Sequence, residues 1–221
     1  MTLRIECADG RDRERAITAA KAAVKRGDLV IIPTETVYAI ATDAFSDRGI
    51  RAMRVAKSYD ETVPLPVMVG SRSTVPGIAT GLTDAARALM DAFWPGPLTV
   101  LLMPQPTLAW ALPTDGPISI RMPLHPVALA LLEASGPLVV TTANTPGLPA
   151  PTLVDDAVSQ IGRLASLALD VGDLADDESL PSTIVDFTGD MPRVVRVGAL
   201  PVSELERICP VEVPEAHPPD A

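Results

Sequence analysis

The sequence predicts an α/β protein, in which strands and helices alternate along the chain. Short runs of Val, Leu and Ile, of the length typical of buried strands, alternate with longer segments whose apolar residues recur every three or four positions. Most of the 23 prolines fall at the ends of these segments, where they stiffen the loops. Hydrophobic residues make up 47 % of the 221 residues and charged residues 21 %, so the chain can bury a sizeable core.

The first predicted helix covers residues 12–26, and Gly27 is placed to end it. Its inner face carries apolar residues at helical spacing: Ile17, Ala20 and Val24. The Leu-Val-Ile-Ile run at 29–32 follows at once and predicts a buried strand, which ends at Pro33.

Four more helices are predicted further along the chain. Asp47 can cap a helix that runs to Lys57, and Thr83 begins a stronger helical pattern that Pro95 ends. The inner faces of these two helices are apolar: Ile50 and Met53 in the first, and Ala86, Leu89, Met90 and Phe93 in the second. The last two predicted helices cover residues 126–134, where Pro126 suits the first turn, and 155–165.

Six further apolar runs are short enough to be strands. They are residues 98–103, 118–121, 138–141, 167–170, 183–187 and 194–196. The chain contains no internal repeat and no internal linker, so we expect one domain over residues 1–209. Residues 210–221 hold four prolines without a periodic pattern, which predicts a frayed tail.

Composition and charge argue against several classes of function. The net charge of −10 disfavours nucleic acid as the main partner, because binding to phosphate backbones depends on Lys and Arg. The two cysteines, Cys7 and Cys209, and the two histidines, His125 and His217, show no metal-ligand spacing, which disfavours a zinc site. No apolar run reaches the roughly 20 residues that a membrane span needs, and no signal-peptide pattern opens the chain, so we expect a cytoplasmic protein.

Several polar segments follow predicted strands or helices, where open α/β sheets bind ligands. The P-T-E-T-V-Y segment at 33–38 carries hydroxyls and a carboxylate that could bind a ligand, although the same residues would also suit a polar loop without a binding role. Lys57 can either interact with the negative end of the helix dipole or bind a phosphate through its positive charge. The W-P-G-P-L-T segment at 94–99 reads mainly as a rigid turn. Arg121 can either bind an anionic ligand through two parallel hydrogen bonds or form a structural ion pair.

Three segments in the second half of the chain are similar in kind. Thr142 and Asn144 precede Pro-Gly, where small polar side chains let backbone N–H groups approach an anion, although an Asx-type turn is the alternative. Ser182 begins one strand and Arg196 ends another. Taken singly, each of these segments indicates only a turn or a surface charge.

Taken together, the segments resemble the YrdC/Sua5 family of threonylcarbamoyl-AMP synthases. The family pattern is P-T-D/E-T-V-Y-G-L, K-x-R, P-L, W-P-G-P-L-T, R-x-P, S-A-N-x-S-G, S-T-V and R-x-G. This chain reads PTETVYAI, KSY, PL, WPGPLT, RMP, TANTPG, STIVD and RVG, in the same order. The resemblance covers roughly residues 15–200, and the ordered set is far more specific than any one motif.

The resemblance implies a twisted mixed sheet flanked by helices, with a deep concave pocket. There L-threonine, bicarbonate and ATP, with Mg²⁺, would give threonylcarbamoyl-adenylate and diphosphate for the tRNA N6-threonylcarbamoyladenosine (t6A) modification at position 37, which downstream transferase partners complete. By matched position, Thr36 and Arg121 would bind threonine. The residues that would bind ATP are Lys57, Thr142, Asn144, Ser182 and Arg196. No residue would act as a covalent nucleophile, because nucleotidyl transfer needs mainly positioning and charge neutralisation.

The chain departs from the family pattern at three places. Tyr59 replaces the Arg of K-x-R and so removes a positive charge, for which Arg54 or Arg72 could substitute. Ala39 replaces the Gly of Y-G-L, so the backbone there must avoid positive φ. The third change removes hydroxyls from the loop after Asn144, at Thr145-Pro146 and Ala150.

These departures leave two hypotheses, and a third comes from a different class of function. The chain is an active synthase whose ATP site has drifted, or a catalytically weakened paralogue that still binds nucleotide. The third is a non-catalytic module for double-stranded RNA, against which the acidic net charge argues.

Overall fold

The computed structural model describes residues 2–7, 10–174 and 180–213 of the chain. Its helices are α1 (Gly10–Lys25), α2 (Asp47–Lys57), α3 (Val75–Ile78), α4 (Asp84–Phe93), α5 (Pro126–Ser135), α6 (Val154–Ile161) and α7 (Val202–Glu206), with a 3-10 turn η1 (Arg72–Thr74). Its strands are β1 (Leu3–Glu6), β2 (Leu29–Pro33), β3 (Tyr38–Asp43), β4 (Val67–Met68), β5 (Ala79–Thr80), β6 (Leu98–Pro104), β7 (Ile118–Arg121), β8 (Leu138–Thr142), β9 (Ala165–Asp170), β10 (Thr183–Asp186) and β11 (Arg193–Arg196).

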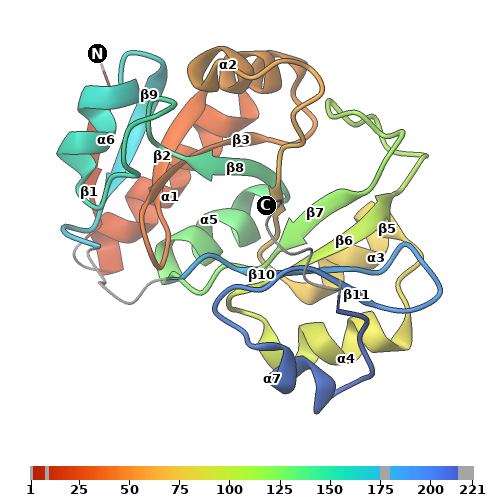
Figure 1. Cartoon of the computed structure of the whole chain (residues 1–221). Helices are drawn as coiled ribbons and strands as arrows, with labels where there is room; N and C mark the ends of the chain where they lie inside the picture. Colours follow the sequence, from red (N-terminus) through yellow and green to blue (C-terminus); the bar gives the residue numbers. More distant parts are fainter. Residues whose placement is uncertain (1, 8–9, 175–179, 214–221) are drawn as a thin grey trace, which may run out of the picture.

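The strands form one mixed sheet, as expected. Its order is β1-β9-β2-β3-β8-β4-β7-β6-β10-β11, and β5 adds to β6. Four neighbouring pairs are parallel, β1–β9, β2–β9, β4–β7 and β6–β10, and the others on this path are antiparallel. Figure 1 shows β1, β9 and β2 on one side of the molecule and β7, β6 and β10 on the other.

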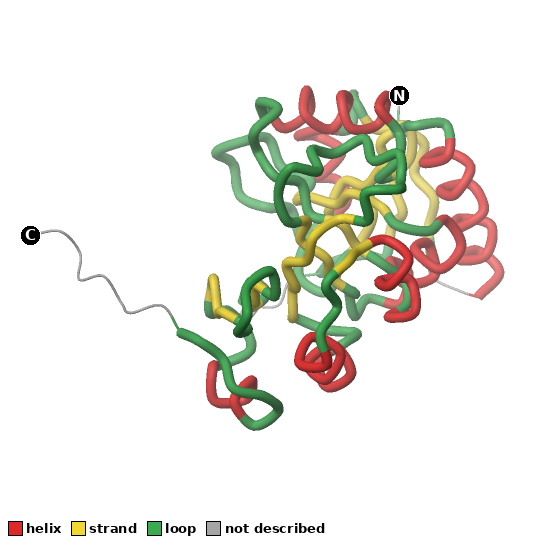
Figure 2. Tube along the Cα trace, turned by 90° about the vertical axis from the view of Figure 1, so that its right-hand side faces the viewer, coloured by secondary structure: helices red, strands yellow, loops and turns green. Residues whose placement is uncertain are grey.

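Helices cover both faces of the sheet. The α1 and α5 helices contact each other and lie together in Figure 1. The α2 and α6 helices each contact β2 and β3. In Figure 2 most of the strands run through the middle of the molecule, with helices above them, below them and to their right. Within the described residues, no helix combines the length and the apolar character that crossing a bilayer would require.

The hydrophobic core consists of two clusters, and β2 contributes to both. Val30 and Ile32 belong to the cluster that α1 and α5 cover, whereas Leu29 and Ile31 belong to the larger cluster on the other face. This division follows from the period of two in a strand, which sends successive side chains to opposite faces. Because both faces are covered, β2 is buried along its whole length, as the Leu-Val-Ile-Ile run predicts.

The predicted helices at 12–26, 47–57 and 126–134 are confirmed within one or two residues, and the helix predicted from Thr83 to Pro95 forms as α4. Thr83 caps α4 by accepting a hydrogen bond from the Ala86 N–H. The prediction of a helix over 155–165 is wrong at its end. Helix α6 stops at Ile161, with Gly162 as its C-cap, and Ala165 already pairs with Leu29 as the first residue of β9.

The segment predicted as a frayed tail is paired where the structure describes it. Glu212 forms a bridge with Arg193: its N–H donates to the Pro192 carbonyl and its own carbonyl accepts from the Val194 N–H. These bonds cover part of the free edge of β11. The rest of the predicted tail, residues 214–221, lies outside the described residues.

Candidate active site

One row across the sheet brings together two of the predicted binding residues. Arg121 on β7 is in register with Thr99 on β6, Thr99 with Ile184 on β10, and Ile184 with Arg196 on β11. Residues in register on neighbouring strands point to the same face, so the two arginines share a face of the sheet. Ser182 joins the row through a 2.8 Å hydrogen bond between its hydroxyl and that of Thr99.

Arg121 is held in a fixed orientation by two contacts. Its Nη2 forms an ion pair with the Glu35 carboxylate, and its Nε donates to the Gly96 carbonyl at 3.1 Å. Gly96 is needed for this path, because a Cβ there would lie 2.5 Å from the Phe93 carbonyl oxygen. Burial and the nearby Arg196 charge lower the pKa of Arg121 to about 10, so it stays cationic at neutral pH.

Arg196 is anchored to the start of β10. Its Nη2 donates to the Ser182 carbonyl at 2.8 Å and to the Ser182 hydroxyl at 3.2 Å, and its Nε donates to the same carbonyl at 3.2 Å. Gly198 allows this close approach, since a Cβ there would lie 2.0 Å from the Pro181 carbonyl oxygen. The R-V-G segment, which contains Arg196, and the S-T segment, which contains Ser182, therefore contact each other directly.

Lys57, Thr142 and Asn144 form a second group. The Lys57 side chain is 2 % exposed, and its Nζ donates to the Thr142 carbonyl at 2.9 Å and to the Asn144 carbonyl and side-chain oxygens at 2.6 and 2.7 Å. The Thr142 hydroxyl donates to the Asn144 side-chain oxygen at 2.6 Å. Desolvation lowers the pKa of Lys57. An ammonium has three N–H donors, and here all three serve the loop that follows β8.

The segment over residues 34–38 makes one contact in the first group and one next to the second. Glu35 reaches Arg121 in the first group, while Tyr38, just after the loop, accepts a hydrogen bond from the Ala143 N–H at 2.9 Å in the second. The half-buried Thr36 lies between them on this loop. This segment therefore links the two groups, and no hydrogen bond or ion pair joins them directly within the described part of the chain.

The sequence-based site omits two of the residues that complete this arrangement. Glu35 and Thr99 lie inside the P-T-E-T and W-P-G-P-L-T segments, so the motifs contained the signal. Their partners are distant in sequence: Glu35 and Arg121 are 86 residues apart, and Thr99 and Ser182 are 83 apart. Motif position alone does not reveal such pairs.

The structure accounts for the Ala39 departure and for part of the change after Asn144. Ala39 lies in a regular strand between Ile32 and Thr142, and Ser58 is the one described non-glycine residue with positive φ. The Thr145 hydroxyl donates to the Gln160 carbonyl of α6 at 3.2 Å and so anchors the loop.

Neither arginine suggested as a substitute for the charge lost at Tyr59 supports that hypothesis. Arg54 donates to the carbonyls of Asp60 and Val63, and Arg72 donates to those of Asp91 and Trp94. Both guanidinium groups hold neighbouring loops in place. Tyr59 itself packs against the hydrophobic core.

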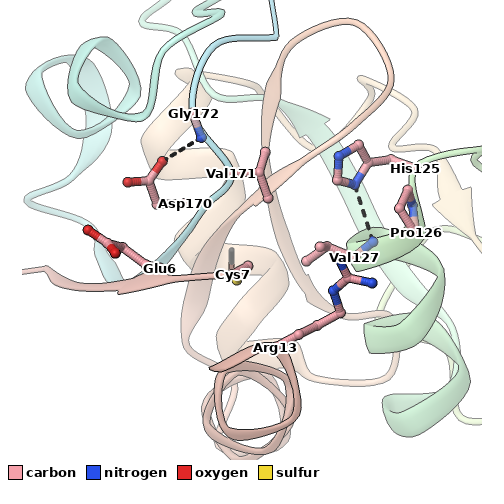
Figure 3. A pocket seen from close by; sticks show the side chains of 9 residues that line it. All are labelled: Glu6, Cys7, Arg13, His125, Pro126, Val127, Asp170, Val171 and Gly172. Carbon is pink, nitrogen blue, oxygen red and sulfur yellow. Dashed lines mark hydrogen bonds between the residues drawn. The ribbon is translucent and has the colours of Figure 1, made fainter. Parts of the chain in front are cut away.

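A separate cavity of about 400 Å³ lies where β1 and β9 end, next to the start of α5 (Figure 3). Cys7, Arg13, His125 and Asp170 are among its lining residues, and none of the predicted site residues is. Burial raises the pKa of the Cys7 thiol and lowers the pKa of His125. This cavity is distinct from the row of residues described above.

Among the residues that the structure describes, no group of three or more His, Cys, Asp or Glu side chains is placed to hold a metal ion. The side chains of the row and of the 142–144 loop are cationic or neutral, and the acidic Glu35 pairs with Arg121 beside them. Such a site suits an anion, and a metal ion that enters with phosphates would take its ligands mainly from them.

The fold and this arrangement define an α/β protein that presents two arginines and two hydroxyls along one row of the sheet, a site suited to anionic ligands. A family model named Sua5_yciO_yrdC, described as telomere recombination, matches residues 22–198. The chain belongs to this Sua5/YciO/YrdC family.

Known proteins agree with this assignment. A Mycobacterium tuberculosis protein with the provisional name threonylcarbamoyl-AMP synthase is 43 % identical over 212 residues, which cover 96 % of this chain and 95 % of that protein. The Bacillus subtilis protein named threonylcarbamoyl-AMP synthase is 31 % identical, over 87 % of this chain and 56 % of that protein. The crystal structure of Pyrococcus abyssi Sua5 complexed with L-threonine matches with a TM-score of 0.84 and 26 % identity, over 96 % of this chain and 62 % of that one.

Proposed function

We propose that this protein forms L-threonylcarbamoyl-adenylate and diphosphate from L-threonine, bicarbonate and ATP. The observation that carries the proposal is the row that joins Arg121, Thr99, Ser182 and Arg196 on one sheet face. Two oriented guanidinium groups with a hydroxyl pair between them are suited to a carboxylate at one end and phosphates at the other.

The residues divide the work by position. Arg121 binds the threonine carboxylate, and Thr36 contacts the same substrate from the 34–37 loop. Arg196 and the Ser182 hydroxyl bind the phosphates of ATP, and Thr142 and Asn144 complete the nucleotide site. Lys57 contributes by holding the 142–144 loop through its three hydrogen bonds. Its direct contact with ATP stays a prediction.

The reaction then needs no protein nucleophile. The threonine amine attacks the bicarbonate carbon, water leaves, and a carbamate oxygen attacks the α-phosphorus while diphosphate departs. Negative charge grows on the phosphates during the last step, and Arg196 would stabilise that charge. Mg²⁺ would accompany ATP and be held mainly by its phosphates.

The product would be consumed by transferase partners that place the threonylcarbamoyl group on the adenosine at tRNA position 37. We place this chemistry in the cytoplasm, where ATP and tRNA are available. The proposal assigns RNA contact to those partners rather than to this acidic chain.

The test is diphosphate release from purified protein with ATP, Mg²⁺, L-threonine and bicarbonate, with each component omitted in turn. We expect release only when all are present. Release that does not depend on threonine or on bicarbonate would contradict the proposal, and so would nucleotide binding without turnover, which would indicate the weakened paralogue.

A further inference from the structure

The pair between Glu35 and Arg121 is incomplete in a way that bears on substrate recognition. One oxygen of Glu35, Oε1, accepts from Arg121 Nη2. The other oxygen, Oε2, is buried and has no hydrogen-bond partner within the described residues. A charged oxygen without a partner is unusual in a folded protein, because desolvating it is costly.

Arg121 is also only partly used. Its Nε and Nη2 are bonded to Gly96 and Glu35, whereas Nη1 has no acceptor among the described residues and is not one of the buried unpaired atoms. A guanidinium can bind a carboxylate end-on through Nη1 and the second proton of Nη2. A substrate carboxylate can therefore dock on Arg121 without breaking the pair with Glu35.

An α-amino acid bound in this way carries its amino group on the carbon next to the carboxylate. Glu35 lies beside the same guanidinium and has one oxygen to spare. The terminal torsion of a glutamate is broad, so a small turn of the carboxylate can bring the buried Oε2 towards the substrate while Oε1 stays within reach of Arg121. The side chain of Glu35 is 20 % exposed, which shows that part of it already reaches solvent.

We propose that Glu35 is the specificity-determining residue that accepts hydrogen bonds from the amino group of the amino-acid substrate. Arg121 and Glu35 together then recognise a zwitterion, a cation for the carboxylate and an anion for the ammonium. The neutral amine formed before attack on bicarbonate still donates to the same oxygen, so Glu35 also orients the nucleophile. This inference rests on the proposed function, because it names how that site selects an amino acid.

The test compares L-threonine with 3-hydroxybutyrate, which has the same carbon chain and hydroxyl but no amino group. Binding of each to the wild type and to Glu35→Gln is measured by calorimetry, with ATP binding and thermal unfolding as checks on folding. Glu133→Gln, at an exposed glutamate on α5, is the matched control. We expect Glu35→Gln to weaken threonine binding about 10- to 100-fold, the range for a lost charge-assisted hydrogen bond, and to leave 3-hydroxybutyrate and ATP unchanged.

Two results would overturn the inference. Equal weakening of both ligands would mean that Glu35 only holds Arg121 in place. Tighter threonine binding in the variant would mean that Glu35 competes with the substrate for Arg121. Failure of the proposed function looks different, because then the wild-type protein itself binds no threonine and releases no diphosphate.

Discussion

Arg196 is the residue whose loss should cost the most activity. It donates to both the carbonyl and the hydroxyl of Ser182, yet it remains exposed at the end of β11. We expect Arg196→Ala to lower kcat/KM for diphosphate release at least about 100-fold, because a cation that stabilises developing charge is removed. Steady-state kinetics measures this effect.

A matched control lies on the same strand. Arg193 is exposed and pairs with Asp186 at 3.3 Å, away from Ser182. We expect Arg193→Ala to keep nearly full activity, since exposed ion pairs contribute little. A comparable loss of activity in both variants would show that the substitutions disturb β11 as a whole, and would contradict a specific role for the Arg196 charge.

At this scale the sequence identifies the cationic residues but not their partners. Arg121, Ser182 and Arg196 lie at strand ends, where motif spacing places them correctly. Glu35 meets Arg121 only because β7 and the 34–37 loop are brought together by the sheet. An ion pair across 86 residues leaves no local pattern to read.

At the scale of elements, Lys57 links the end of α2 to the loop after β8. Replacing it by Met would remove a donor from the Thr142 carbonyl and from both Asn144 oxygens, of which the side-chain oxygen would keep the Thr142 hydroxyl. We expect Lys57→Met to cost about 1–3 kcal/mol of stability, to speed hydrogen exchange in residues 142–148 and to raise KM for ATP. Lys21→Met, at an exposed position on α1, is the control.

Hydrogen exchange decides between the two roles of Lys57. Faster exchange in the loop together with weaker ATP binding supports the positioning role. Weaker ATP binding with unchanged exchange would instead restore the direct phosphate contact that the family resemblance implies.

Tyr38 joins β3 to the end of β9. It is fully buried, and its hydroxyl donates to the Gly172 carbonyl at 2.8 Å and accepts from the Val171 N–H at 3.1 Å. Burial raises the pKa of Tyr38 from 10.0 to about 12. Because the folded value is the higher one, this contribution to stability is complete below pH 10 and is lost as the pH rises towards 12.

We expect Tyr38→Phe to cost about 1–3 kcal/mol at pH 7 and to flatten the loss of stability between pH 10 and 12. Urea unfolding across that range measures both effects. A variant that keeps the wild-type slope would show that another group controls the alkaline transition.

Most of the elements that the sequence does not predict are short or exposed, and β3 is an exception. Strands β4 and β5 have two residues each, which is too few for any periodicity. Strand β1 is mostly exposed, so it lacks an apolar signature. Strand β3 is buried throughout although it includes Thr42 and Asp43, and its position between β2 and β8 supplies the hydrogen bonds that hold it.

At the scale of the whole molecule, the net charge of −10 sets an expectation for RNA. We expect tRNA to bind more weakly than about 10 µM at physiological salt, because few phosphates can be neutralised. Filter binding at several salt concentrations measures this. Tight, specific binding without ATP turnover would favour the RNA-binding hypothesis.

The order of the strands in the sheet cannot be predicted from the pattern of residues along the chain. Alternating elements predict an α/β class, but β9 lies between β1 and β2, and β8 between β3 and β4. Such long-range pairings depend on which faces bury best together, a property of the assembled molecule. The arrangement of the site could not be predicted for the same reason, because its row of residues depends on the pairing of β7, β6, β10 and β11.

The saturated ammonium of Lys57 has a practical consequence for inhibitor chemistry. A compound that aims an acidic group at this lysine would have to break three short bonds before gaining one. A better lead would spread its acidic groups between the guanidinium ends of β7 and β11. Medicinal effort on this scaffold should start from those two anchors.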